Sequence, residues 1–167
     1  YETMMSLVPP VDGARPYQQV PMQYSLHILR EPGGQLEHKE FLHREPTNPA
    51  EPLLKQLRSD IGETGSVIVW HESFEKGRNQ ELGVMVPEYA TFMQQLNERV
   101  VDLKLPFSED WYEDYRFLGS ASIKKVLPVL VPELSYKELT IQEGQSAQRL
   151  WMEVVFEGKN HGKKEQI

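Results

Sequence analysis

The sequence contains no cysteine, which excludes a disulfide framework, a thiolate-bound zinc site and a thiol nucleophile. Long apolar runs are also absent. The longest such stretch covers residues 126–131 and is interrupted by Pro128. Because a membrane-spanning helix needs roughly 18 or more apolar residues in succession, we expect no membrane-spanning segment.

Positive charge is scarce. The 167 residues include 18 Lys and Arg against 25 Asp and Glu, so the net charge is −7 and the isoelectric point lies near 5.3. This excess of negative charge argues against broad electrostatic adhesion to nucleic acid or to an anionic membrane. It remains compatible with a metal-dependent nuclease, because the metal site of such an enzyme is itself acidic.

The chain is long enough for one domain with a real core, since 39% of its residues are hydrophobic and 10% are aromatic. It begins at Tyr1 rather than at a methionine, and neither end resembles a natural domain boundary. We therefore expect a single domain over residues 1–167 that is truncated at both ends and cut from a longer protein.

Hydrophobic periodicity predicts a hairpin in the first third of the chain. Apolar residues alternate with polar ones over 22–29, paired glycines within 31–34 indicate a turn, and 36–42 is typical of the returning strand. Asn48 and Pro49 then have the residue types that open a helix, and Gly62 is suited to end it.

Helices and strands alternate in the rest of the chain. The β-branched run 67–70 is typical of a buried parallel strand, Pro87 begins a helix whose apolar stripe reaches Val100, and residues 147–155 form a last helix. This order predicts an α/β fold with a mixed sheet, in which an antiparallel hairpin precedes a parallel strand and helices flank the sheet. A further strand is expected ahead of Tyr1.

Acidic residues follow the predicted strand 67–70, at the carboxyl end where ligands collect in open α/β sheets. Glu72 and Glu75 are three residues apart and share a helix face if a helix begins there. Paired carboxylates suit a divalent cation, which prefers hard oxygen ligands. The alternative is a helix whose first turn carries acids that complement the helix dipole.

Other candidates are isolated. Glu2 is either a functional carboxylate or a solvated surface residue. Asp102 is either a functional carboxylate or an aspartate that ends a helix or forms a turn. The basic pair at 124–125 follows small residues and is suited to approach a phosphate backbone, or else lies on a solvated helix face. The histidines show no metal-ligand spacing, and the sequence has no phosphate loop and no nucleophile elbow.

The order of these features resembles that of the RNase H-like nucleases of the DEDD exonuclease type. The features are Glu2, Phe74-Glu75, Asp102-Leu103 and the segment Ser122-Ile123-Lys124-Lys125-Val126. Over essentially its whole length the chain is similar to a bacterial family of domains of unknown function in that superfamily. Members of that family often follow a PD-(D/E)XK nuclease domain.

The resemblance implies an RNase H-like mixed β-sheet and a 3′-5′ exonuclease that hydrolyses phosphodiester bonds of single-stranded DNA or RNA. It implies two divalent ions, Mg or Mn, which activate a water and stabilise the leaving oxygen while four carboxylates hold them. It further implies a cytoplasmic protein with an attached PD-(D/E)XK nuclease domain in the longer chain.

The resemblance also assigns roles. Glu2 and Glu75 take the places of catalytic metal ligands, His71 takes that of an asparagine in the second motif, and Asp102 supports the site. Contacts to nucleic acid would come from Lys124 on phosphate and from Trp70 and Phe74 stacked on bases.

Two departures from the family pattern affect the expected activity. Glu75 stands where the family has aspartate, which moves the carboxylate by more than about 1 Å, and His71 replaces a neutral amide by a titrating imidazole. The family's other two carboxylates would lie outside residues 1–167, so we expect this chain to be inactive alone. The alternative is a degenerate RNase H-like module that binds nucleic acid or a partner without cutting, or a structural companion of an attached nuclease domain.

Overall fold

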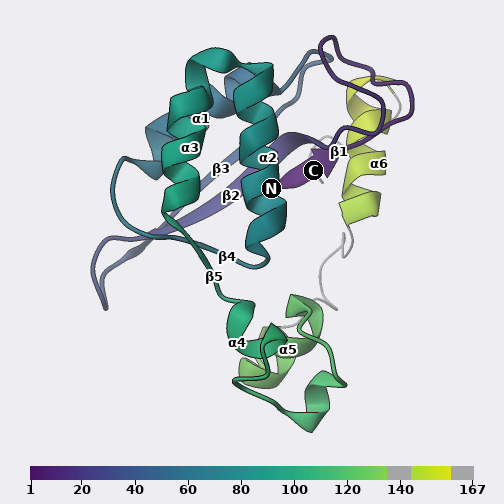
Figure 1. The fold of residues 1–167 in the computed structure, drawn as a ribbon. Helices are drawn as coiled ribbons and strands as arrows, with labels where there is room; N and C mark the ends of the chain where they lie inside the picture. The colour runs from purple at the N-terminus through teal and green to yellow at the C-terminus, as the bar shows by residue number, and fades with distance from the viewer. Residues whose placement is uncertain (135–143, 159–167) are drawn as a thin grey trace.

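The computed structural model describes residues 1–134 and 144–158, in which three strands come first, helices and strands alternate next, and helices follow the last strand (Figure 1). In chain order the elements are β1 (Glu2–Met4), β2 (Val20–Leu29), β3 (Leu36–Leu42), α1 (Ala50–Ile61), β4 (Val67–Val69), α2 (Glu72–Met85), the 3-10 turn η1 (Pro87–Tyr89), α3 (Ala90–Glu98), β5 (Val100–Asp102), α4 (Leu105–Ser108), the 3-10 turn η2 (Tyr115–Phe117), α5 (Ile123–Leu130) and α6 (Gly144–Val155). The prediction of a single domain over 1–167 extends into residues outside those described.

The strands form two sheets. β1, β2 and β3 make an antiparallel sheet in that order, and β4 pairs with β5 in parallel. The predicted hairpin is confirmed, because β2 and β3 pair from Gln23 opposite Leu42 to Leu29 opposite Leu36. The α/β fold class is therefore confirmed with both kinds of pairing, but in the described residues these pairings lie in two sheets rather than one.

Helix α1 forms where its end signals predict it. The side-chain oxygen of Asn48 accepts the Ala50 N–H at 2.9 Å, and Gly62 follows the last helical residue with φ 66°. A positive φ is available to glycine without Cβ strain, so this residue ends the helix at low cost. The local pattern alone thus sets both ends of α1.

The apolar core lies between the antiparallel sheet and the helices that cover one of its faces (Figure 1). Tyr24 of β2 packs with the stripe of α1 and with α2 and α3, while α6 places Trp151 against Met4, Val20 and Met22. The other buried residues of this first cluster are Ala50, Leu53, Leu54, Leu57, Leu82, Met93 and Leu96. Polar residues such as Ser25 and His27 alternate with these on β2 and are exposed, as one-sided sheets require.

Three details of the sequence prediction are corrected. The strand β4 is not buried, since Ile68 is 54% exposed and β4 has only β5 beside it in the described structure. The helix predicted from Pro87 begins as a 3-10 turn and becomes α3 only at Ala90. It also stops before Val100, which belongs to β5 because its backbone pairs with β4.

A group of short helices lies beyond the carboxyl ends of β4 and β5, apart from the antiparallel sheet (Figure 1). Aromatic rings hold this group together: Phe107 of α4 stacks on Trp70 at 5.3 Å and meets the edge of Phe117 at 5.8 Å, measured between ring centroids. None of the described helices has the length and apolar character needed to cross a bilayer.

Candidate functional site

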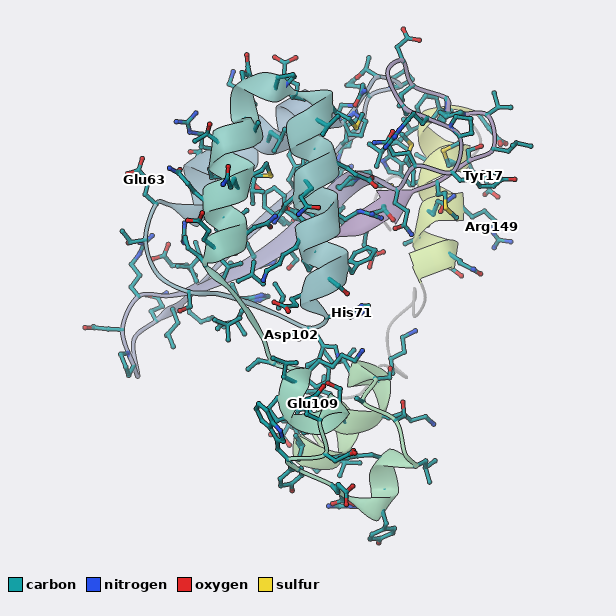
Figure 2. The ribbon with its side chains drawn as sticks, viewed as in Figure 1. Tyr17, Glu63, His71, Asp102, Glu109 and Arg149 are labelled. Atoms are coloured by element: carbon teal, nitrogen blue, oxygen red, sulfur yellow. The ribbon has the colours of Figure 1, made fainter. Side chains whose placement is uncertain are left out.

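Asp102 fixes the geometry at the carboxyl ends of the parallel strands. Its carboxylate accepts three backbone N–H groups, from His71 at 2.9 Å, from Glu72 at 2.8 Å and from Lys104 at 2.9 Å. The side chain is buried, and Figure 2 shows it next to His71 where β5 leaves the sheet. One aspartate of β5 therefore positions the start of α2 and the chain that follows β5.

The pKa of Asp102 lies below its ordinary value. Burial acts to raise this pKa, but the backbone N–H groups of Glu72, His71 and Lys104 outweigh it because they bond the charged form. The Asp102 carboxylate therefore positions the turn between β4 and α2. Its supporting role in a nuclease site stays a prediction.

His71 occupies that turn in a left-handed conformation, with φ 85° and ψ 74°. Its imidazole is exposed and lies 3.1 Å from the Ser73 hydroxyl. Any residue other than glycine is destabilised by roughly 1–2 kcal/mol in this left-handed region of φ and ψ, because its Cβ atom approaches the backbone. The three hydrogen bonds of Asp102 hold the backbone there in spite of that cost.

This strain gives an ordered prediction for substitutions at position 71. His71→Gly is expected to keep or raise the free energy of unfolding, by up to about 0.5 kcal/mol, because the relief of strain exceeds the added entropy of the unfolded chain. His71→Val is expected to lower it by about 1–2 kcal/mol, since β-branched residues tolerate positive φ poorly. Urea denaturation of the three proteins measures both values, and equal stability of the Gly and Val variants would contradict the account.

Glu75 lies one turn into α2. Both of its carboxylate oxygens are 3.4 Å from the backbone nitrogen of Tyr1, and its side chain is 19% exposed. Glu72 has a different partner, Lys76, at 2.6 Å. The two acids of the first turn therefore do not act as a pair: Glu72 forms a helix-surface ion pair, and Glu75 faces the backbone nitrogen of Tyr1 beside β1.

A partly buried chain of hydrogen bonds joins Tyr1, the residue before β1, to α2 and α3 beside Glu75. The Tyr1 hydroxyl donates to the Asn79 side-chain oxygen at 2.7 Å, and the Asn79 amide donates to Asn97 at 2.8 Å. Burial, with the Glu75 carboxylate nearby, raises the pKa of the Tyr1 phenol well above its ordinary value. The sequence analysis did not select Tyr1, Asn79 or Asn97 as site residues. The one signal available was Asn79, an asparagine three residues before Leu82 and on the same buried face of the helix.

Glu2 is not brought to the same place. It lies opposite Gln23 in the β1–β2 ladder, and so on the sheet face opposite the one where Tyr1 packs. Its carboxylate approaches Gly144 at the start of α6, where an added Cβ would lie 3.1 Å from Oε2. The structure thus places Glu2 and Glu75 on different sides of β1.

The donor set does not complete a metal centre. Residues 1–134 and 144–158 contain no group of three or more His, Asp or Glu side chains arranged to hold a metal ion. Glu75 directs both oxygens toward the backbone nitrogen of Tyr1, and Glu2 does not join it. The carboxylates in the described structure therefore fit, at most, one end of a divalent site.

A pocket of about 950 Å³ lies between the turn at His71 and the short helices. Trp70 forms one wall: its indole N–H donates to the Ala121 carbonyl at 3.1 Å and its ring stacks on Phe107. Lys104 supplies a positive charge that sequence reasoning did not single out. Acidic lining residues accompany it, namely Asp110, Glu113 and Asp114.

The remaining predicted nucleic-acid residues lie outside this pocket. Phe74 packs under the guanidinium of Arg78, 5.3 Å from the ring centroid. Lys124 is exposed on the first turn of α5 and does not line the pocket, although its neighbour Ile123 does. Of the three predicted contacts to nucleic acid, the structure places only Trp70 in the pocket wall.

Fold and site together define an α/β protein with a carboxylate and an aromatic pocket at the carboxyl ends of two parallel strands. The chain belongs to the family described as Domain of unknown function (DUF2779), whose model matches residues 1–122. This match includes every predicted site residue except Lys124. No curated protein and no solved structure matches the chain.

Proposed function

We propose that this chain is an RNase H-like part of a metal-dependent nuclease, which hydrolyses phosphodiester bonds of single-stranded nucleic acid from the 3′ end. The observation that carries the proposal is the position of Glu75: a carboxylate with a side chain only 19% exposed, in the first turn of α2, just past the carboxyl end of the parallel strand β4. Ligands of open α/β folds collect at this edge. The motif order found in the sequence supports the same class.

The metal in this proposal is Mg or Mn, which prefer the hard oxygen ligands that Glu75 and Glu2 offer. When bound, such ions supply an activated water and stabilise the leaving oxygen. Glu75 and Glu2 are two of the four carboxylates that the resemblance calls for, and the described residues do not bring them together. The proposal therefore concerns a longer protein that contains this chain, and we expect residues 1–167 alone to be inactive.

The pocket beside His71 suits a nucleobase better than a phosphate. Its wall is the stacked pair of Trp70 and Phe107, and base–aromatic stacking contributes about 1–3 kcal/mol per base. The acidic residues of its lining repel a phosphate, while Lys104 can bind one at the rim. Lys124, exposed on the first turn of α5, adds a second positive charge outside the pocket.

A second candidate is a degenerate RNase H-like module that binds nucleic acid or an attached PD-(D/E)XK nuclease domain without cutting. The separation of Glu2 and Glu75 on different sides of β1 favours it, because a two-metal mechanism needs its carboxylates in one place. This module would use the aromatic pocket and would not require a divalent ion.

A nuclease assay on a longer protein containing this chain separates the two. End-labelled single-stranded DNA and RNA are incubated with Mn²⁺, Mg²⁺ or EDTA, and the products are resolved by length. Laddering from the 3′ end that requires the metal is the expected result. Binding that persists in EDTA, with no cleavage under any metal, would overturn the nuclease proposal and support the binding module.

A further inference from the structure

A slot of about 270 Å³ separates the two sheets. One side is formed by β2 at Tyr24, Ser25 and Leu26, and the other by β4 from Val67 to Val69. Tyr1, the residue before β1, lies at one end of the slot, and apolar side chains of α1 and α3 form its floor. Figure 1 shows the edge of β2 passing close to β4 in this region.

The β2 edge along this slot carries unused backbone groups. The Met22 carbonyl accepts the His43 N–H at 2.9 Å, so alternate residues from Met22 onward direct their backbone groups to β3. Gln23 points the other way and pairs with Glu2 of β1. Ser25 and His27 point the same way as Gln23, where the described structure places no strand beside them.

The β4 edge carries a matching group. The Val67 N–H bonds the Arg99 carbonyl and the Val69 carbonyl accepts the Leu103 N–H, both at 2.9 Å, so these two valines use β5. Ile68 lies between them and directs its N–H and C=O away from β5, toward the slot. The slot is therefore bounded on both sides by strand edges whose donors and acceptors face into it.

We propose that this slot takes one more β-strand, a continuation of β1 on the N-terminal side of Tyr1, which joins the two sheets into one. The strand continues an established pairing: Glu2 lies opposite Gln23, so the residue directly ahead of Tyr1 falls opposite Ser25 and the third residue ahead falls opposite His27. Unpaired edges bind an added strand through their backbone groups, and this one occupies both edges at once.

The register also specifies the composition of the strand. The second residue ahead of Tyr1 lies on the same face as Tyr1, over the apolar floor formed by Leu57, Ile61 and Leu96, and is therefore apolar. The first and third residues lie on the exposed face beside Ser25 and His27 and are polar. A segment whose apolar residues fall at even positions ahead of Tyr1 fits the slot. The same segment shifted by one residue directs its apolar side chains to the exposed face and does not fit.

The test adds six residues ahead of Tyr1 in three forms. The matched extension is Val-Thr repeated three times with threonine next to Tyr1, the shifted extension is Thr-Val repeated three times, and the third is Gly-Ser repeated three times. Amide hydrogen exchange is then measured by NMR at Ser25, His27 and Ile68. Tyr24, which pairs with β3, serves as the internal reference.

The matched extension is expected to slow exchange at Ser25, His27 and Ile68 at least about tenfold relative to the Gly-Ser form, with Tyr24 unchanged, because new ladder hydrogen bonds protect these amides. The shifted extension is expected to give less protection and a lower midpoint of thermal unfolding. Equal exchange in all three proteins would overturn the proposal. Protection in the unextended chain that grows with protein concentration would assign the slot to a second copy and would overturn it as well.

Discussion

Replacing Glu75 by alanine is expected to lower phosphodiester cleavage by a longer, active protein at least about a thousandfold. Loss of a carboxylate that holds the metal removes several kcal/mol of transition-state stabilisation, and a thousandfold corresponds to about 4 kcal/mol. The change in stability is expected to be small, since the Glu75 side chain is 19% exposed and its contacts to the Tyr1 nitrogen are long, at 3.4 Å. Initial rates on end-labelled single-stranded DNA and RNA measure the effect.

Two control variants distinguish the loss of a metal ligand at Glu75 from the loss of any one negative charge. Glu88→Ala removes an exposed carboxylate from η1, away from the pocket, and is expected to leave the rate unchanged. Glu75→Gln keeps the volume and one oxygen but loses the charge, so it is expected to fail nearly as completely as alanine. Undiminished cleavage by a folded Glu75→Ala protein would remove Glu75 from the metal site.

The hairpin and α1 could be predicted from sequence because their determinants are local. Alternation over β2 and β3 sets which residues face the helices, and the Asn48 side chain and Gly62 mark the two ends of α1. Each of these signals acts over a few residues, and the three-dimensional fold does not override them.

Helix α2 could not be predicted with the same certainty. Over its 14 residues the buried positions are Asn79, Leu82 and Gly83, so an apolar stripe is nearly absent. Its start depends on Asp102, a residue 30 positions away that accepts the Glu72 N–H. The parallel pairing of β4 with β5 brings these residues together, and no local pattern encodes that pairing.

The candidate site likewise has features that local sequence predicts and features that depend on long-range contacts. Its place at the carboxyl end of β4 follows from the short β-branched run and the acids after it, which sequence reasoning can read. The surroundings of Glu75 and the hydrogen bonds of Asn79 depend on where β1 lies relative to α2, which is a long-range property. The separation of Glu2 from Glu75 likewise follows from strand register and has no signature in residue spacing.

Replacing Asp102 by alanine is expected to lower the free energy of unfolding by about 3 kcal/mol. The substitution leaves the N–H groups of His71, Glu72 and Lys104 without their acceptor, and each unsatisfied buried donor costs about 1–3 kcal/mol, less where water can replace the partner. For a chain of this size the midpoint of thermal unfolding should fall by about 10 °C. Calorimetry and urea titration measure the two quantities.

Asp114 supplies a matched control for this prediction. It also accepts a backbone N–H, that of Arg116 at 2.9 Å, but it does so within a 3-10 turn on the surface. Asp114→Ala is expected to have a much smaller effect than Asp102→Ala, because its hydrogen bonds join residues two positions apart rather than separate elements. Equal losses in the two variants would show that Asp102 does not tie β5 to the start of α2.

The charge of Asp102 makes this contribution depend on pH. Because its pKa in the folded chain is depressed, the unfolded state takes up a proton first as the pH falls, so the stabilisation is fully present above the unfolded value of about 3.9. It is lost as the pH falls through the folded pKa. Asp102→Asn keeps one acceptor oxygen but has no such titration, so the difference in stability between the wild type and this variant is expected to be constant near neutral pH and to shrink below about pH 4. A difference that stays constant down to pH 2 would mean that the hydrogen-bonding geometry of Asp102, and not its charge, positions the turn at His71.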